Sequence, residues 1–192
     1  MNTENTEKFD LVVKFKNTNQ NKKRPKDKED EQVYEIEGID EIEGALTHRD
    51  PELYIKESES FDVVLVELGT DSLEATNLLR NSNPKIVSTV IPIRKVVKTD
   101  LKEIGRSLKE LAINKMEPGD DFSVQTSVVS HENIGSDDIL EKVEDELKDI
   151  NMNLNEADPK WKIYVEVVGE NTGLNILKLE ESYCVLSCKD YN

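Results

Sequence analysis

Apolar residues recur with two different spacings in the first half of the chain, and the change of spacing marks the expected elements. Short runs of branched and aromatic residues predict strands at 9–15, 53–55, 61–68 and 85–93. Apolar residues at helical spacing predict a weak helix over 33–46 and a second helix that Asp71 or Ser72 caps. The resulting order, strand–helix–strand–strand–helix–strand, is the order of a ferredoxin-like domain.

The second half begins with an amphipathic helix from about residue 99 to 116 and continues with alternating strands and helices. The spacing predicts a strand over 122–128, a helix that Ser136 caps, and a strand over 161–167. The sequence Asn171-Thr172-Gly173 is typical of a turn, and we expect closing strands at 174–179 and 183–186. The pattern therefore indicates an α/β (α+β) protein with two parts.

The helix that opens near Thr99 and Asp100 combines an apolar face with a basic stripe. On a helical wheel, apolar residues that include Leu101, Ile104 and Leu108 share one arc. The adjacent arc is basic, and it is separate from Asp100, Glu103 and Glu110; it holds Lys98, Lys102, Arg106 and Lys109. Arg94 and Lys95 precede this stripe. An ordered basic stripe can contact phosphates, but it can equally be a solvated helix flank whose salt bridges contribute little.

The composition makes this stripe unusual. The 192 residues carry 25 basic and 41 acidic side chains, a formal net charge of −16, and both halves of the chain are acidic. The far field of such a protein repels phosphate, so nucleic-acid binding needs a local basic patch. The acidity therefore counts against RNA binding without excluding it.

Two polar segments lie outside the regular elements. Residues 1–8 are expected to be a flexible tail. Residues 17–32 lack apolar side chains, apart from the ring of Pro25, and predict a mobile loop. The basic run at 22–26 can contact phosphate, but the acidic residues that follow it make a solvated loop at least as good an interpretation.

Catalytic and metal-binding signatures are missing from the sequence. Cys184 and Cys188 are separated by three residues without a second pair, which is not a zinc-ligand spacing and favours partly buried thiols. His48 and His131 are far apart, and the chain has neither a phosphate-binding loop motif nor a nucleophile elbow. No apolar run is long enough for a membrane span. We expect a cytoplasmic protein that is not an enzyme and has no cofactor or metal.

Several of these segments together resemble a THUMP domain. The resemblance rests on Ile91-Pro92-Ile93, Thr99-Asp100-Leu101, Phe122-Ser123-Val124, Gly135-Ser136 and the strand 161–167. It implies a ferredoxin-like domain over 9–93 and a THUMP-like domain over 94–192. In that family the paired domains hold tRNA, and THUMP binds the single-stranded acceptor end. The layout is most similar to stand-alone THUMP proteins that act as adaptors for a tRNA cytidine acetyltransferase.

One departure from the family pattern concerns the strand and loop that precede the second helix of the THUMP-like part. Family members usually carry several basic residues there, whereas this chain offers His131 beside Glu132. The resemblance then implies that RNA contacts depend on residues outside that loop, namely Arg94, Lys95, Lys98, Lys102, Arg106 and Lys109. Two alternatives stay open: an acidic protein-interaction module that has lost RNA binding, and the RNA-binding half of a split tRNA-modifying enzyme of the thiouridine synthase or methyltransferase type.

Overall fold

The computed structural model describes residues 6–16 and 28–182. Within these residues the chain divides into two compact units. The first unit contains residues 9–92, and the second contains residues 93–182 together with residues 6–8. Residues 6–8 join the second unit, where the Glu7 amide donates to Asn171 Oδ1 at 3.1 Å. None of the helices in these described residues is long and apolar enough to cross a lipid bilayer.

The first unit has the ferredoxin-like order that the sequence predicts. Its elements are β1 (Leu11–Phe15), α1 (Lys28–Leu46), β2 (Tyr54–Glu57), β3 (Val63–Glu67), α2 (Ser72–Asn81) and β4 (Val87–Pro92). The sheet has the order β2-β3-β1-β4, and all three strand pairs are antiparallel. Because β1 and β2 run in the same direction with β3 between them, this is the split arrangement of the ferredoxin-like fold.

Successive side chains of a strand point to opposite faces of the sheet, and the apolar residues at alternate positions show which face carries the core. Leu11 and Val13 of β1 pack with Val64 and Val66 of β3 against apolar residues of both helices, which include Ile42 and Leu79. Two carboxylates fix the loops around this core. Asp50 Oδ2 accepts the amides of Gly69 at 2.9 Å and Thr70 at 3.0 Å. The Glu41 carboxylate accepts the amides of residues 85, 86 and 87, which lead into β4.

Helix α1 corrects the prediction for the polar segment 17–32. The helix begins at Lys28, so residues 28–32 are helical rather than part of a loop. Glu31 lies in the first turn of this helix, where negative charge is favourable because it interacts with the positive end of the helix dipole. The rest of the predicted loop, including the basic run 22–26, lies outside the described residues.

The second unit is a five-stranded sheet with two long helices. Its elements are β5 (Lys95–Lys98), α3 (Leu101–Lys115), β6 (Asp121–Val129), α4 (Ser136–Lys148), β7 (Asn153–Leu154), β8 (Trp161–Val168), β9 (Asn171–Lys178) and α5 (Leu179–Ser182). The sheet order is β5-β9-β8-β6-β7. Strand β6 runs parallel to β7 and β8, whereas β9 runs antiparallel to β8 and β5.

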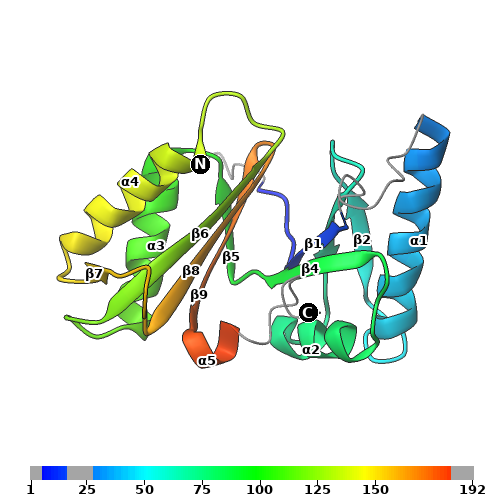
Figure 1. The fold of residues 1–192 in the computed structure, drawn as a ribbon, viewed down its shortest axis with the longest axis horizontal. Helices are drawn as coiled ribbons and strands as arrows, with labels where there is room; N and C mark the ends of the chain where they lie inside the picture. The colour runs from blue at the N-terminus through cyan, green and yellow to red at the C-terminus, as the bar shows by residue number, and fades with distance from the viewer. Residues whose placement is uncertain (1–5, 17–27, 183–192) are drawn as a thin grey trace, which may run out of the picture. The chain divides into compact units, whose positions relative to one another are not determined.

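Helices α3 and α4 lie on one face of this sheet (Figure 1), with α3 over β5 and β9 and α4 over β6 and β7. Both helices bury the apolar faces that their periodicity predicts. Ile104 and Leu108 of α3 meet Ile139 and Val143 of α4 in one core, which strand residues such as Ile163 complete. Gly105 allows the close approach of the helices, since a Cβ there would lie 2.9 Å from Glu146 Cγ and 2.9 Å from Lys142 Cε.

Several local predictions in the second unit are wrong. The segment after Ile93 forms a separate strand, β5, instead of passing directly into the helix. The sequence Asn171-Thr172-Gly173 opens β9 because its residues pair with β8, and the turn lies at Gly169, whose φ of +55° suits glycine. Gly135, not Ser136, is the N-cap of α4.

The chain end differs as well. Residues 179–182 form the short helix α5, so the predicted strand 174–179 ends at Lys178. The predicted strand 183–186, with Cys184, and also Cys188 lie outside the described residues.

Candidate nucleic-acid interface

The strand register of the second unit brings three connections to the same end of the sheet. Lys98, the last residue of β5, pairs with Asn171, the first residue of β9. Asn171 also pairs with Val168 at the end of β8, and Val168 pairs with Val129 at the end of β6. The start of α3, the β8–β9 turn and the β6–α4 loop therefore all leave the sheet at this end (Figure 1). We call it the loop end. It holds the N-termini of both long helices, which carry positive partial charge.

A network of short polar contacts fixes the start of α3 at the loop end. The Thr99 amide donates to the carbonyl of Glu170 at 2.9 Å, and Thr99 Oγ1 lies 2.9 Å from the carbonyl of Gly169. Asp100 Oδ1 then accepts the amides of Lys102 at 2.9 Å and Glu103 at 3.0 Å. This N-cap takes up two of the free amides of the first turn, and it sets the direction in which the first exposed side chains of α3 point.

Three of the predicted RNA-binding residues lie at or near the loop end: Lys98, Lys102 and Arg106, which we call the loop-end cations. All three side chains are exposed to solvent. Arg106 Nη2 lies 2.6 Å from Glu103 Oε2, but 66% of its side-chain surface stays accessible. In the part of the chain that the structure describes, the Lys102 ammonium forms no ion pair. Consecutive members are four residues apart, so Lys102 and Arg106 project from one flank of α3.

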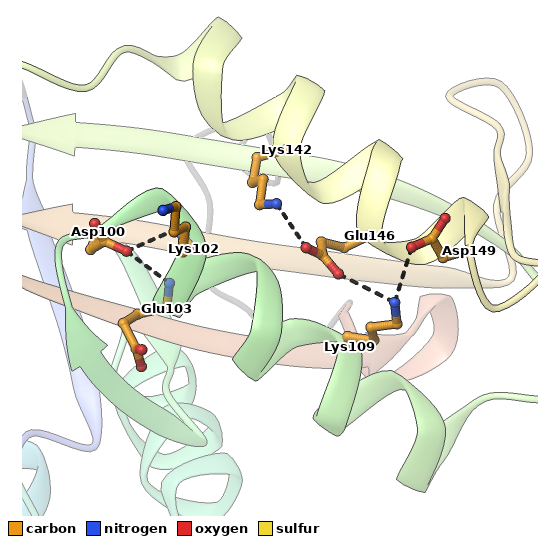
Figure 2. A network of polar contacts seen from close by, with 7 residues as sticks. All are labelled: Asp100, Lys102, Glu103, Lys109, Lys142, Glu146 and Asp149. Atoms are coloured by element: carbon orange, nitrogen blue, oxygen red, sulfur yellow. Dashed lines mark hydrogen bonds and ion pairs between the residues drawn. The ribbon is translucent and has the colours of Figure 1, made fainter.

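Lys109 has a different environment, although it continues the same stripe. Its Nζ lies 3.3 Å from Glu146 Oε2 and 3.2 Å from Asp149 Oδ2, and only 28% of its side chain is accessible. Glu146 also accepts from Lys142 Nζ at 2.7 Å (Figure 2). The hydrogen bond to Asp149 is the main reason that the pKa of Lys109 is raised. The hydrogen bond from Lys142 is the main reason that the pKa of Glu146 is lowered. The two ion pairs make Lys109 part of the contact between α3 and α4.

Arg94 and Lys95 lie at the opposite end of β5 from Lys98. Lys98 lies three positions after Lys95 along the strand, which corresponds to about 10 Å. Lys95 Nζ lies 2.8 Å from Glu110 Oε2, and this hydrogen bond lowers the pKa of Glu110. Nearby, Lys115 Nζ donates to the carbonyl of Ile176 at 2.6 Å. Burial lowers the pKa of Lys115, and the charge of Arg94 lowers it further.

His131 lies in the loop between β6 and α4, at the loop end. Its ring is half-buried, and Nδ1 accepts the amide of Asn133 at 3.4 Å. The residues around it are acidic: Asp138 Oδ2 accepts the Gly135 amide at 2.8 Å, and the first turn of α4 holds Asp137 and Asp138. The start of α4 thus already interacts with its own carboxylates, as the start of α3 does with Asp100, and no exposed cation of the predicted set lies on it.

The structure therefore divides the predicted residues into separate groups. It brings together Lys98, Lys102 and Arg106, places His131 at the same end of the sheet, and puts Arg94, Lys95 and Lys109 in other surroundings. Exposed lysine and arginine side chains can bind phosphate oxygens. Among the described residues, no group of three His, Cys, Asp or Glu side chains is arranged to hold a metal ion.

Sequence reasoning missed the acidic partners of the stripe. Glu146 and Asp149 lie about forty residues after Lys109 in the sequence, and the helical wheel of α3 cannot show them. The wheel also separates Glu103 from the stripe, yet its long side chain reaches Arg106, and Glu110 reaches Lys95, which precedes the stripe. One signal was available: the spacing of Lys142 and Glu146 marks an intrahelical pair on α4.

Comparison with known proteins gives one family match. The family described as "THUMP domain" matches residues 98–177, which cover β5 from its last residue, both long helices and the strands to β9. The match begins at the first of the loop-end cations, so all three lie within it. No curated protein matches the chain.

Solved structures share the fold. The chain is similar to PH1313 from Pyrococcus horikoshii, with a TM-score of 0.67 and 17% identity over 89% of this chain and 54% of that one. The chain is also similar to a 4-thiouridine synthetase in complex with RNA and ATP, with a TM-score of 0.54 and 14% identity over 94% of this chain and 42% of that one. For TrmN from Thermus thermophilus the TM-score is 0.52 and the identity is 13%, over 86% of this chain and 44% of that one. This chain thus spans about half or less of the length of each.

Proposed function

Because residues 98–177 are a THUMP domain, we propose that this chain binds tRNA and that the loop-end cations contact its phosphates. The observation that carries the proposal is the placement of Lys98, Lys102 and Arg106. An acidic protein needs a local basic patch to bind RNA, and these three exposed cations flank the start of one helix. Phosphate contacts of this kind position an RNA without reading its sequence.

The part of the tRNA that the second unit holds is, in this proposal, the single-stranded 3′ acceptor end. The expectation comes from the THUMP resemblance, and the similarity to a 4-thiouridine synthetase crystallised with RNA supports it. Single-stranded RNA is flexible enough for its phosphates to follow cations on a curved surface such as the start of a helix. His131, half-buried in the neighbouring loop, is then an additional contact at the same end of the sheet.

We further propose that the chain acts as an adaptor in the cytoplasm and presents tRNA to a separate modifying enzyme, for which a cytidine acetyltransferase is the candidate. The ferredoxin-like unit followed by a THUMP domain supports this, since the layout is that of stand-alone THUMP adaptors. In this proposal the chain holds the substrate and the partner performs the reaction. Purification of the chain from its own cells with its partners tests the adaptor role. Recovery of an RNA acetyltransferase supports it, and recovery of a thiolation or methylation subunit favours the split-enzyme alternative.

A protein-interaction module is the second candidate, and one observation favours it. Ion pairs neutralise Lys109, which belongs to the basic stripe, and Lys95, which precedes it, in a chain with a net charge of −16. An acidic surface of this kind suits a basic protein partner. In that case tRNA affinity is negligible at physiological salt.

Salt-dependent tRNA binding separates the two candidates. The experiment compares the wild type with a triple variant, Lys98→Ala with Lys102→Ala and Arg106→Ala, on intact tRNA and on tRNA trimmed of its 3′ single strand. The matched control is Lys148→Ala with Lys160→Ala and Lys178→Ala. It removes the same charge from exposed lysines of the same unit, and Lys160 and Lys178 lie at the opposite end of the sheet.

The proposal predicts that the loop-end variant loses affinity for all tRNAs, that the control variant does not, and that trimming weakens only proteins with intact loop-end cations. Circular dichroism checks that both variants are folded. Equal affinities for the wild type and a folded loop-end variant would remove the loop-end cations from the RNA interface.

A further inference from the structure

Strand β6 has one paired edge and one open edge. One edge pairs with β8 from Phe122, opposite Trp161, to Val129, opposite Val168. On its other edge, β7 pairs only with Asp121 and Phe122 (Figure 1). Within the described residues, no strand pairs with the remainder of that outer edge. β6 is therefore an edge strand over most of its length, although β7 lies beyond it in the sheet order.

The direction of its backbone groups shows which of them remain available. In a parallel ladder, each residue points its N–H and C=O to the same side, and successive residues alternate. The Val129 carbonyl accepts the Gly169 amide at 2.9 Å, so the odd-numbered residues face β8. The Phe122 carbonyl accepts the Asn155 amide at 2.8 Å, so the even-numbered residues face outward. Thr126 and Val128 therefore direct N–H and C=O groups to the open edge, where the described chain supplies no partner.

Beyond the Val124 amide, which lies 3.5 Å from Glu156 Oε1, the open edge also lacks the usual protection against strand pairing. Natural edge strands are commonly blocked by charged side chains, proline or a bulge. Residues 124–129, with the sequence Val-Gln-Thr-Ser-Val-Val, contain no charge and no proline, and their register with β8 is continuous. Their side chains are only half-buried. Such an edge is a template for an added strand, which gains its affinity from main-chain hydrogen bonds.

The charge around the open edge selects the type of partner. Lys142 and Glu146 of α4 face α3, because Gly105 approaches both. Asp137 and Glu144 lie on the other flank of α4, the flank on the side of β6 and β7. Glu132 follows β6, and Glu156 Oε1 lies 3.5 Å from the Val124 amide.

We propose that the open edge of β6 receives a basic, extended segment of a partner protein as an added strand. A lysine-rich segment with alternating side chains would pair its backbone with Thr126 and Val128 and place its charges near the surrounding carboxylates. A second copy of this chain fits less well, since each copy carries a net charge of −16. The inference does not rest on RNA binding, because it concerns an acidic edge rather than the loop-end cations.

The test uses the full chain and two synthetic peptides of about eight residues, a common strand length. One peptide alternates lysine with valine, and the other alternates glutamate with valine. Amide hydrogen exchange by NMR follows Thr126 and Val128 with and without each peptide. The variant Thr126→Pro removes an outward N–H without touching the β8 ladder, and Thr126→Val is its matched control because it keeps the N–H and the shape of the side chain.

The proposal predicts that the lysine peptide slows exchange at Thr126 and Val128, and that the glutamate peptide binds at least about tenfold more weakly. Thr126→Pro should weaken the lysine peptide by about tenfold, the equivalent of one lost hydrogen bond, while Thr126→Val stays close to the wild type. If Thr126→Pro does not fold, the amide exchange of the wild type decides the question alone.

Three results would overturn the proposal. The first is the absence of binding by the lysine peptide. The second is binding that leaves the exchange of Thr126 and Val128 unchanged, which would indicate a contact elsewhere on the acidic surface. The third is concentration-dependent dimerisation of the chain that protects the same two amides, since a second copy would then occupy the edge.

Discussion

The basic stripe runs along both halves of helix α3, but the two halves differ in the acidic side chains that the fold places beside it. Near the N-terminus, Lys102 is exposed, and Asp100 uses its carboxylate for the helix cap rather than for an ion pair with the stripe. Near the C-terminus, α4 brings Glu146 and Asp149 to Lys109. A cation in a helical stripe is therefore available to a ligand only where the neighbouring helix supplies no acid. In this protein that condition separates the first half of α3 from the second.

Leu108 lies between these halves and packs both against the core, so its replacement should lower the stability of the second unit more than any other change considered below. Its side chain is fully buried in the core of the second unit. We expect Leu108→Asp to destabilise that unit by more than about 3 kcal/mol, because it places a carboxylate in an apolar core. Thermal unfolding followed by circular dichroism measures the change. The exposed Lys102→Asp is the control on the same helix, and comparable losses for both variants would show that burial is not the cause.

The N-cap at Asp100 tests the first half of α3. Asp100→Ala removes the acceptor of two backbone amides, and we expect a loss of about 1 kcal/mol of stability, with looser placement of Lys102. Asp100→Asn should stay close to the wild type, since an asparagine side chain caps equally well. Denaturant titration of the three proteins measures the difference. An alanine variant as stable as the asparagine variant would show that the cap does not hold this end of the helix.

The network around Glu146 tests the second half through its pH dependence. The pKa of Glu146 is lowered in the folded chain, so its stabilising contribution is complete above its ordinary pKa of 4.5 and is lost as the pH falls through the folded value. The pKa of Lys109 is raised, so its contribution is complete below 10.5 and is lost as the pH rises further.

We expect Glu146→Gln to flatten the acid limb of the stability curve between pH 4.5 and lower values and to leave the loop end unaffected. Glu132→Gln, an exposed carboxylate at the loop end, serves as the control. Denaturant unfolding at a series of pH values measures the free energy of unfolding of each variant as a function of pH. If the two variants show the same acid limb as the wild type, the contact between α3 and α4 does not depend on this carboxylate.

The sequence predicted the fold better than it predicted the surroundings of the site. Periodicity placed both long helices and most strands, because the apolar faces that it identifies are the faces that the cores bury. It failed where a short strand, β5, follows directly on another, and where buried Thr172 and Gly173 resemble a turn. The start of α3 could be predicted, since the Asp100 cap and the stripe are local. The neutralisation of Lys109 could not, since it depends on a helix about forty residues away.

The salt dependence of tRNA binding for two single variants tests the central claim most directly, namely that Lys102 contacts RNA phosphates whereas Lys109 is held in ion pairs with α4. In a folded Lys102→Ala protein, the slope of log affinity against log salt should fall by about 0.7 to 0.9, the contribution of one phosphate contact. In Lys109→Ala, which removes an equal charge from the same helix, the slope should not change. Equal changes for both variants, or no change for either, would contradict the account.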